Sequence, residues 1–162
     1  LSASLETKRF QPQITLNRMA EIYKQGDNVP EEEVDPAWGV CPLLMPDDTC
    51  AIYDVRPFAC RCLVSTEDCN ALGYSQMSEF TLTVNNIMLQ YLEHIDLTGF
   101  TGNLLDMILY METEEHKKQY LTANGDLPKI FIANSPATVL LAPQEEKSQL
   151  EPLLRELNNT DL

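Results

Sequence analysis

Apolar residues recur at helical spacing along much of the chain, and this pattern predicts a mainly helical protein. Residues 15–25 form one such stretch, with Thr15 placed to cap the helix and Gly26 to end it. A longer stretch, 78–98, begins at Ser78 and has a nearly continuous apolar stripe. The residues expected to face the core on this second helix are Phe80, Val84, Ile87, Met88, Tyr91, Leu92 and Ile95.

Further helices are expected at 103–111, 113–121 and 144–158. The last of these contains Pro152, which predicts a break or a kink because proline cannot donate a backbone hydrogen bond. One helical turn is also expected at 30–34, where proline is followed by acidic residues. These elements predict that the second half of the chain is predominantly α-helical.

The β-forming signal is short and weak. Residues 128–133 and 138–142 are rich in β-favouring residues, and a small pairing between them is one arrangement that the pattern allows. Residues 51–53 read as another short strand, and 46–49 as a turn. Residues 65–73 resemble a short capped helix that carries the last cysteine. We therefore expect a mainly α fold with at most a minor β pair.

Length and composition favour one domain, because 162 residues with 44% hydrophobic content suffice for a single core. Within it we expect a cysteine-rich module over residues 38–72 and a mainly helical part over 73–162 that packs around the module. The formal net charge of −14 argues against nucleic acid and anionic membranes as partners, and it suits a basic protein partner.

The cellular setting is predicted from the same composition. No run approaches the roughly 20 apolar residues of a membrane helix, so none is expected. Five cysteines is an odd number, which argues against a fully oxidised secreted framework. We therefore expect a reducing, cytoplasmic setting.

All of the cysteines lie in one short part of the chain, and this density indicates a metal site. Thiolate sulfur is a soft donor that suits zinc, iron and iron–sulfur centres. The spacing contains no Cys-x-x-Cys pair, so density rather than spacing carries the signal. The predicted ligands are Cys41, Cys50, Cys60, Cys62 and Cys69.

Two arginines flank one of these cysteines in a chain with only 11 basic residues. Arg56 and Arg61 lie on either side of Cys60. A guanidinium near sulfur lowers the thiol pKa and so favours the thiolate that binds metal. The alternative for Arg56 is a surface ion pair with Asp54 or Glu67.

These residues together resemble a known family. The pattern Cys-Pro-Leu-Leu, a short turn, Cys-x-Ile-Tyr and then Arg-Pro-x-x-Cys-Arg is similar to that of the YkgJ-type cysteine-cluster proteins, described as zinc- or iron-chelating. The matching residues are Cys41, Pro42, Leu43, Leu44, Cys50, Ile52, Tyr53, Arg56, Pro57, Cys60 and Arg61. The resemblance implies metal binding through the three matched cysteines, with Tyr53 and the two arginines as supporting residues.

The chain departs from that family in one respect. Its members usually carry an earlier cluster of the Cys-x-x-Cys-Cys kind, whereas residues 1–40 contain no cysteine. Either such a cluster precedes Leu1, or Cys62 or Cys69 completes the site. The two cases imply different numbers of metal ions.

Three kinds of function remain open. The first is a zinc- or iron-binding protein in metal handling or in protein assembly or modification. The second is an enzyme, either a metal-assisted modifying enzyme, since a related cysteine motif occurs in a flagellin lysine methylase, or a thiol–disulfide redox protein that uses Cys60 and Cys62. The third is a helical interaction domain with structural cysteines. The sequence contains no familiar catalytic motif, so catalytic residues are not assigned.

Other residues with metal-binding chemistry have ordinary alternatives. Trp38 could cover the site or anchor the core. The only histidines, His94 and His116, are candidate distant ligands, although a satisfied or solvent-facing role is more usual. One acidic run could bind a hard cation but suits a solvated helix face equally well. Its residues are Asp106, Glu112, Glu114 and Glu115.

Overall fold

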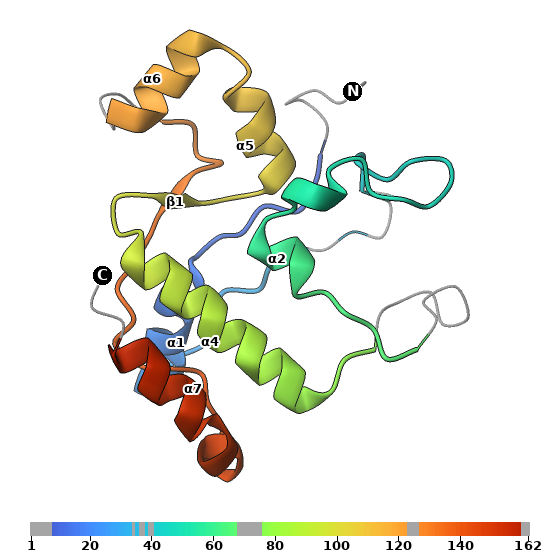
Figure 1. Cartoon of the computed structure of the whole chain (residues 1–162). Coiled ribbons are helices and arrows are strands. Elements are labelled where there is room, and N and C mark those ends of the chain that lie inside the picture. Colours follow the sequence, from blue (N-terminus) through green and yellow to red (C-terminus); the bar gives the residue numbers. More distant parts are fainter. Residues whose placement is uncertain are drawn as a thin grey trace.

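The computed structural model confirms a mainly α protein with one small antiparallel sheet (Figure 1). It describes residues 8–33, 35, 38, 41–67, 76–122 and 127–159. None of the helices in these ranges is long and apolar enough to cross a membrane. In chain order the elements are α1 Leu16–Gln25, the 3-10 helix η2 Tyr53–Val55, α2 Phe58–Arg61, α4 Glu79–Ile95, β1 Phe100–Thr101, α5 Leu104–Tyr110, α6 Glu114–Thr122, β2 Ile132–Ala133, the 3-10 helix η3 Gln144–Glu146 and α7 Lys147–Asn159.

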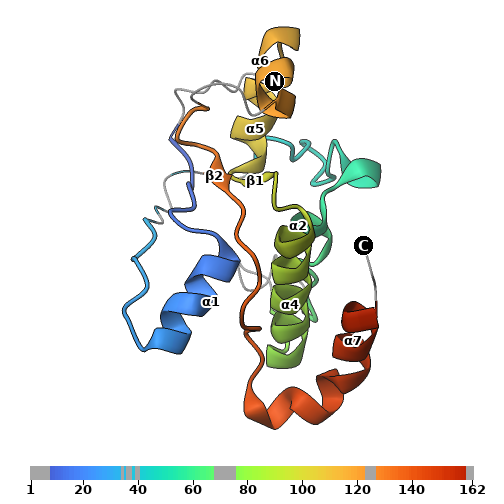
Figure 2. The same ribbon diagram turned by 90° about the vertical axis from the view of Figure 1, so that its left-hand side faces the viewer.

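Helix α4 is the central element of the fold. Figure 2 shows α1 on one side of α4 and α7 on the other, with the chain that follows β2 running down between α1 and α4. Helices α5 and α6 lie beyond the end of α4 that leads into β1, and α2 lies beside α4 (Figure 1). Segments from both ends of the sequence therefore pack against one helix.

Local capping signals fix α1 as expected. The Thr15 hydroxyl accepts a hydrogen bond from the backbone N–H of Arg18, and Gly26 ends the helix at φ 77°. That left-handed conformation costs a glycine little, because it has no Cβ to clash. Ala20 lies buried on the face toward α4. The predicted bounds of this helix are confirmed.

Helix α4 begins at the predicted cap, Ser78, but its buried face differs from the expected apolar stripe. Leu92 and Ile95 are exposed, whereas polar side chains occupy much of the buried face. The reason is that this face packs against irregular backbone, whose N–H and C=O groups require polar partners. The buried residues are Thr83, Ile87, Gln90 and Glu93.

Gln90 is fully buried and links three parts of the chain. Its side-chain amide donates to the Val139 carbonyl at 2.9 Å and to Asn17 Oδ1 at 3.1 Å. Its carbonyl oxygen accepts from the Leu141 N–H at 2.8 Å. Since the 138–142 backbone is satisfied by this side chain, it does not form the predicted strand.

Glu93 and Asn17 complete this polar core. The two carboxylate oxygens of Glu93 accept from the backbone N–H groups of Asn17, at 3.0 Å, and Ser135, at 2.8 Å. The Asn17 side chain donates in turn to the Ser135 carbonyl at 2.7 Å. A carboxylate that accepts from the first turn of α1 also complements the positive end of that helix.

The small sheet has partners other than the expected ones. β2 pairs with β1 in antiparallel register, Phe100 with Ala133 and Thr101 with Ile132. An aromatic cluster lies beside it. The ring centroid of buried Phe131 is 6.0 Å from that of Phe100 and 5.0 Å from that of Tyr110. The β pair is therefore real, but its predicted pairing of 128–133 with 138–142 was wrong.

Two other local expectations were also wrong. Residues 30–33 form no helical turn, and the Glu31 carbonyl instead accepts a hydrogen bond from the Gln13 side chain at 2.9 Å. Residue 34, the last of the expected turn, lies outside the described residues. Residues 51–53 form turns that lead into η2 rather than a strand. Most of the short helix expected at 65–73 lies outside the described residues.

The last helix behaves as its proline predicts. It opens with η3 and continues as α7, in which Pro152 is an internal residue and Leu150 is buried. Figure 2 shows α7 changing direction along its course. The hydrogen bond that proline cannot donate accounts for the bend.

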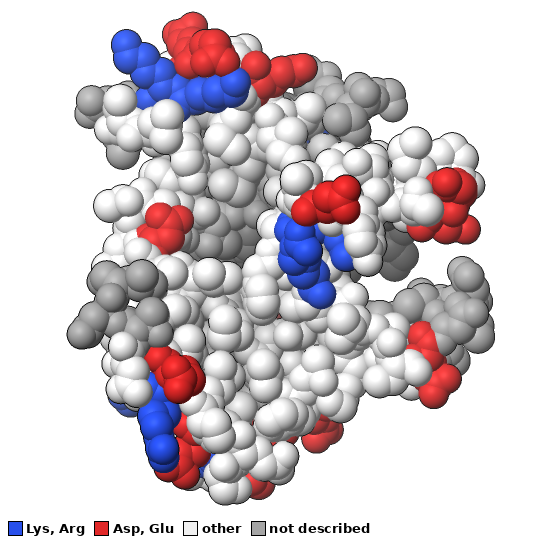
Figure 3. All heavy atoms as spheres, viewed as in Figure 1, with Lys and Arg blue, Asp and Glu red and all other residues white. Residues whose placement is uncertain are grey.

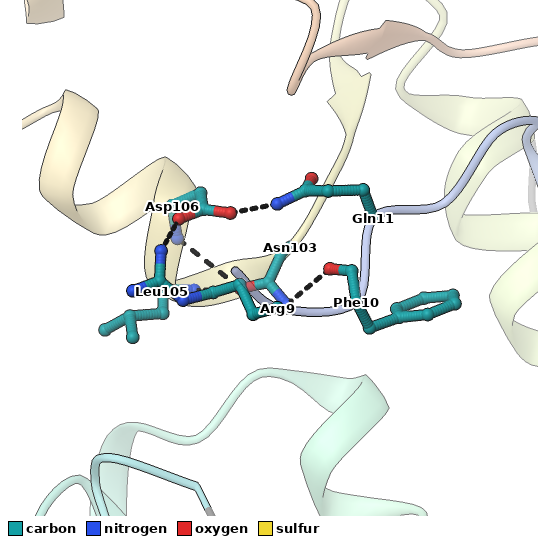
Figure 4. Close-up of polar contacts among 6 residues, drawn as sticks. All are labelled: Arg9, Phe10, Gln11, Asn103, Leu105 and Asp106. Atoms are coloured by element: carbon teal, nitrogen blue, oxygen red, sulfur yellow. Dashed lines mark hydrogen bonds and ion pairs between the residues drawn. The ribbon is translucent and has the colours of Figure 1, made fainter. Parts of the chain in front are cut away.

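The segment before α1 is tied to α5 through Asp106 (Figure 4). The Arg9 guanidinium and the Gln11 amide both donate to the Asp106 carboxylate, which is almost fully buried. Asn103 donates to the Phe10 carbonyl at 3.0 Å and also caps α5. Asp106 therefore forms a buried ion pair and does not belong to a solvated acidic face.

Candidate functional site

Four of the five cysteines lie in the described residues 41–67, which we call the cysteine lobe, and all four are free thiols. The first part of the lobe is a tight turn. Leu44 forms an antiparallel bridge with Cys50, and the Met45 N–H donates to the Thr49 carbonyl at 2.8 Å. The predicted turn at 46–49 is confirmed, with Asp47 Oδ1 accepting from the Thr49 hydroxyl at 2.7 Å. This turn brings the chain from Cys41 back toward itself at Cys50.

The other two thiols lie on α2 and directly after it. Pro57 precedes the helix with φ −64°, and its carbonyl accepts from the Cys60 N–H at 3.0 Å. Cys62 follows as the C-cap, and its thiol donates to the Ala59 carbonyl at 3.3 Å. Both side chains are half-buried. This short helix thus sets their relative positions.

Arg61 joins α2 to the turn before it. Its guanidinium donates through Nε to the Arg56 carbonyl and through Nη2 to the Asp54 carbonyl, each at 2.7 Å. Arg56 donates to the Tyr53 carbonyl, and its guanidinium lies 3.9 Å from the centre of the Tyr53 ring. The three supporting residues named by the motif therefore make the internal contacts that shape the lobe.

Burial and charge act on the thiols together. Burial raises the pKa of Cys60 above its ordinary value, and the nearby Cys41 and Cys50 thiols raise it further. Arg56 lowers the pKa of Cys60, but this is the smallest of the four effects. The expected lowering by the arginines is therefore outweighed. The Cys41 and Cys50 thiols thus act on the pKa of Cys60 in the same direction as burial.

Cys62 shows a similar balance, with burial raising its pKa most and Cys60 adding to the rise. A hydrogen bond from its own backbone acts in the opposite direction. Arg61, whose donors are directed to backbone carbonyls, does not supply the expected activation of this thiol.

The thiols are gathered without forming a complete metal site in this conformation. Over the described ranges, no group of three or more His, Cys, Asp or Glu side chains is arranged to hold a metal ion. The Cys41 and Cys50 thiols nevertheless contribute to the raised pKa of Cys60. Cys69 lies outside the described residues. The lobe therefore holds three candidate ligands in one neighbourhood but not at ligand geometry.

The two histidines make contacts elsewhere. His94 Nδ1 accepts from the Ala137 N–H at 3.1 Å. His116 lies within hydrogen-bonding distance of the Tyr110 carbonyl, 2.8 Å away, and stacks on the Tyr110 ring with centroids 4.3 Å apart. Trp38 is half-buried. These contacts match the ordinary alternatives rather than ligand roles.

The acidic run near α6 has a partner of its own. Glu114 pairs with Lys117 at 2.5 Å on an exposed face. Asp106, by contrast, is buried against Arg9. The acidic run therefore consists of a surface part at Glu114 and a core part at Asp106. A shared cation site among these acids has no support from the described contacts.

The lobe also exposes large apolar side chains, a feature that the sequence pattern did not single out. Four of them lie near Arg56 or Arg61 in sequence, and the other two directly precede Pro46. The sequence signal that could have found them is the presence of apolar residues in a segment rich in prolines. The exposed residues are Leu44, Met45, Tyr53, Val55, Leu63 and Val64.

Fold and site together define a mainly α protein with an irregular, cysteine-bearing lobe attached to its central helix. The attachment includes a hydrogen bond of 2.8 Å from the Asn85 side chain on α4 to the Cys62 carbonyl. Comparisons with family models, curated proteins and solved structures find no match. The resemblance to the YkgJ-type proteins therefore rests on residues 41–61 alone.

Proposed function

We propose that the chain is a metal-binding protein that takes zinc or iron through the thiolates of the cysteine lobe. One observation carries the proposal: the turn closed by the Leu44–Cys50 bridge returns the chain at Cys50 toward the segment that follows Cys41, and both thiols contribute to the raised pKa of Cys60. These are the three cysteines that the family motif marks as ligands. Thiolates at these three positions would supply soft donors of the kind that zinc and iron prefer.

A complete site requires about four ligands and a small rearrangement of the lobe. Cys62 is one candidate for the fourth ligand, because the Cys60 thiol contributes to the raised pKa of Cys62. Cys69 is the other candidate. Three sulfurs on a turn and a one-turn helix can converge on a cation without disturbing the helical core. An iron–sulfur centre would use the same donors.

The raised pKa of the thiols gives this binding a pH dependence. A cation must displace the protons from Cys60 and its neighbours, so affinity falls as pH falls. The same raised pKa disfavours a thiol–disulfide enzyme, which needs a thiolate at neutral pH. We propose that the protein acts in metal handling or in protein assembly or modification. The proposal also includes a cytoplasmic setting and a basic protein partner.

The test is the metal content of protein purified under reducing conditions, measured by elemental analysis for the wild type and for Cys41→Ser, Cys50→Ser and Cys60→Ser. We expect zinc or iron in the wild type and a clear loss in each variant. Ala59→Ser is the matched control, because it adds the same hydroxyl to an exposed position of α2 without removing a thiol. Wild-type metal content in all three cysteine variants would contradict the proposal.

A further inference from the structure

A groove of about 430 Å³ lies where the segment before α1, helix α1 and helix α4 meet the small sheet. Its lining is mainly apolar, and one of the lining side chains, Leu92, is 38% exposed. The apolar residues that share this groove include Phe10, Ile14, Met19, Leu89, Leu92 and Phe100. Apolar surface that is open to solvent and bordered by polar groups marks an interaction site.

The charged residues that line this groove are all acidic, and they are Glu32, Glu93 and Asp96. The Glu93 carboxylate is already occupied, because it accepts from two backbone N–H groups. Glu32 and Asp96 are exposed, and neither forms an ion pair in the part of the chain that the structure describes. Asp96 accepts only a long hydrogen bond, 3.5 Å, from the Asn134 side chain. Two carboxylates of the groove are therefore available to a cationic partner.

The residues next to the lining in sequence do not reverse this charge. Arg9 and Arg18 each pair with an acidic side chain of their own, and Lys8 is the only other Lys or Arg within two positions of a lining residue. Glu32 itself lies in the acidic run 31–33. Figure 3 shows an acidic group over the end of α4 that leads into β1, with no basic group beside it in this view. The surroundings of the groove are therefore negative.

Hydrogen bonds between distant residues fix the parts of the chain that carry the two available carboxylates. The Gln13 amide donates to the Glu31 carbonyl at 2.9 Å, so the chain that carries Glu32 returns alongside the segment before α1. The Asn134 amide donates to the Asp96 carbonyl at 2.7 Å, which ties the end of α4 to the residue after β2. The groove thus combines an apolar surface with acidic groups from two separate parts of the fold.

We propose that this groove docks a segment of a partner protein in which large apolar side chains lie beside lysine or arginine. The apolar side chains of the partner fill the groove, and its cations meet Glu32 and Asp96. An acidic segment would be repelled by these carboxylates and by the net charge of −14. The groove is open to solvent, whereas small-molecule sites bury most of their ligand, so a chain segment suits it better. The inference rests on the basic protein partner of the proposed function and not on its metal.

The experiment is fluorescence polarisation of the full chain with labelled short peptides that combine leucine or phenylalanine with lysine or arginine. We expect binding that weakens between about 0.05 and 0.5 M NaCl, because salt screens the attraction between opposite charges. Leu92→Lys should weaken binding about tenfold or more, since it places a cation in the apolar groove. Leu82→Lys is the matched control, because Leu82 lies on the same helix, is 41% exposed and does not line the groove.

A second pair of variants tests the charge alone. Glu32→Lys should weaken peptide binding about fivefold or more, because it turns an attraction into a repulsion. Glu33→Lys is its control, since it makes the same change one position away, at an exposed residue outside the lining. Circular dichroism shows whether each variant is folded. If Leu92→Lys does not fold, the two glutamate variants decide the question.

Three results would overturn the proposal: no binding by any peptide of this class, equal binding by peptides whose basic residues are replaced with glutamine, or equal losses in the groove variants and their controls. The zinc and iron content of the same preparations is measured alongside. Metal-loaded protein that binds no peptide would refute this inference and leave the metal site intact. Metal-free protein that binds the peptides would do the reverse.

Discussion

Gln90 shows how a single polar side chain can take the place of secondary structure in a core. Its side-chain amide satisfies two acceptors and one backbone donor, on α1 and on the 139–141 segment, at a position with no solvent access. Buried backbone groups need partners, and the 139–141 segment has no strand beside it to supply them. The amide therefore fixes where that segment lies.

Replacing Gln90 with leucine should lower the free energy of unfolding by about 3 kcal/mol, because several buried polar groups lose their partner at roughly 1–3 kcal/mol each. Urea unfolding measures the change. Gln149→Leu is the control, since Gln149 is exposed on α7 and should change stability by less than about 0.5 kcal/mol. Similar small effects in both variants would contradict the role given to Gln90.

The Cys60 thiol predicts a loss of stability at alkaline pH in metal-free protein. Its pKa is higher in the folded state than in the unfolded state, mainly through burial. Its contribution is therefore fully present below the ordinary thiol pKa of about 8.5 and is lost as pH rises through the folded value.

Unfolding free energies measured from pH 7.5 to 10.5 should fall more steeply for the wild type than for Cys60→Ala. Tyr120, whose pKa is also raised mainly by burial, contributes equally to both proteins and cancels in the comparison. Parallel curves for the two proteins would show that the thiol is not buried as described.

At the scale of elements, Arg61 joins α2 to the turn before it through two hydrogen bonds of 2.7 Å. Lysine keeps the charge but cannot present the same planar pair of donors to two carbonyls. Because these bonds position the candidate ligands of the proposed metal site, Arg61→Lys should weaken zinc binding by that site about tenfold or more while leaving the helical core folded. Competition with a chelating dye measures the affinity.

Arg155→Lys provides the control for Arg61→Lys. Arg155 is exposed on α7 and pairs with Glu151 at 2.8 Å, outside the cysteine lobe. We expect wild-type zinc affinity for this variant. A similar loss in both proteins would point to a general effect of removing a guanidinium.

The elements that could be predicted from sequence are those whose signals are local. Thr15, Gly26 and Ser78 mark helix ends through contacts within a few residues, and all three lie where expected. The turn at 46–49 follows from Asp47 in the same way. Each of these signals is complete within one short stretch of chain.

The elements that could not be predicted depend on distant partners. The sheet joins residue 100 to residue 133 in strands of only two residues, too short for an alternating pattern. The buried face of α4 contains Gln90 and Glu93 because the backbone that follows β2 packs there, which the helix sequence does not reveal. In the candidate site, the motif names candidate ligands, but the opposing effects on the pKa of Cys60 depend on burial that the motif does not reveal.

At the scale of the whole molecule, the ion pair between Arg9 and Asp106 ties the first described segment to α5. The Asp106 side chain is only 3% exposed. A buried pair adds little net stability when intact, but a single buried charge is costly. The pair therefore acts mainly as a constraint on where the N-terminal segment can lie.

Arg9→Met should destabilise the protein by about 3–5 kcal/mol, because it leaves the Asp106 carboxylate buried without its cation. The double variant Arg9→Met with Asp106→Leu should recover much of this loss. Thermal or urea unfolding measures both. Arg18→Met is the surface control, because its exposed pair with Glu21 is worth less than about 1 kcal/mol. A double variant no more stable than the single one would contradict the expected penalty.

The hydrogen bonds of Gln90 also have a consequence for synthesis on the ribosome. Helices α1 and α4 are complete once residue 95 has been made, yet the groups that satisfy Gln90 lie as far along as Leu141. At usual elongation rates those residues follow on the order of several seconds later. During that interval the Gln90 amide on the nascent α1–α4 pair is exposed to water. The buried hydrogen bonds of Gln90 to residues 139 and 141 can form only after the second half of the chain has been made.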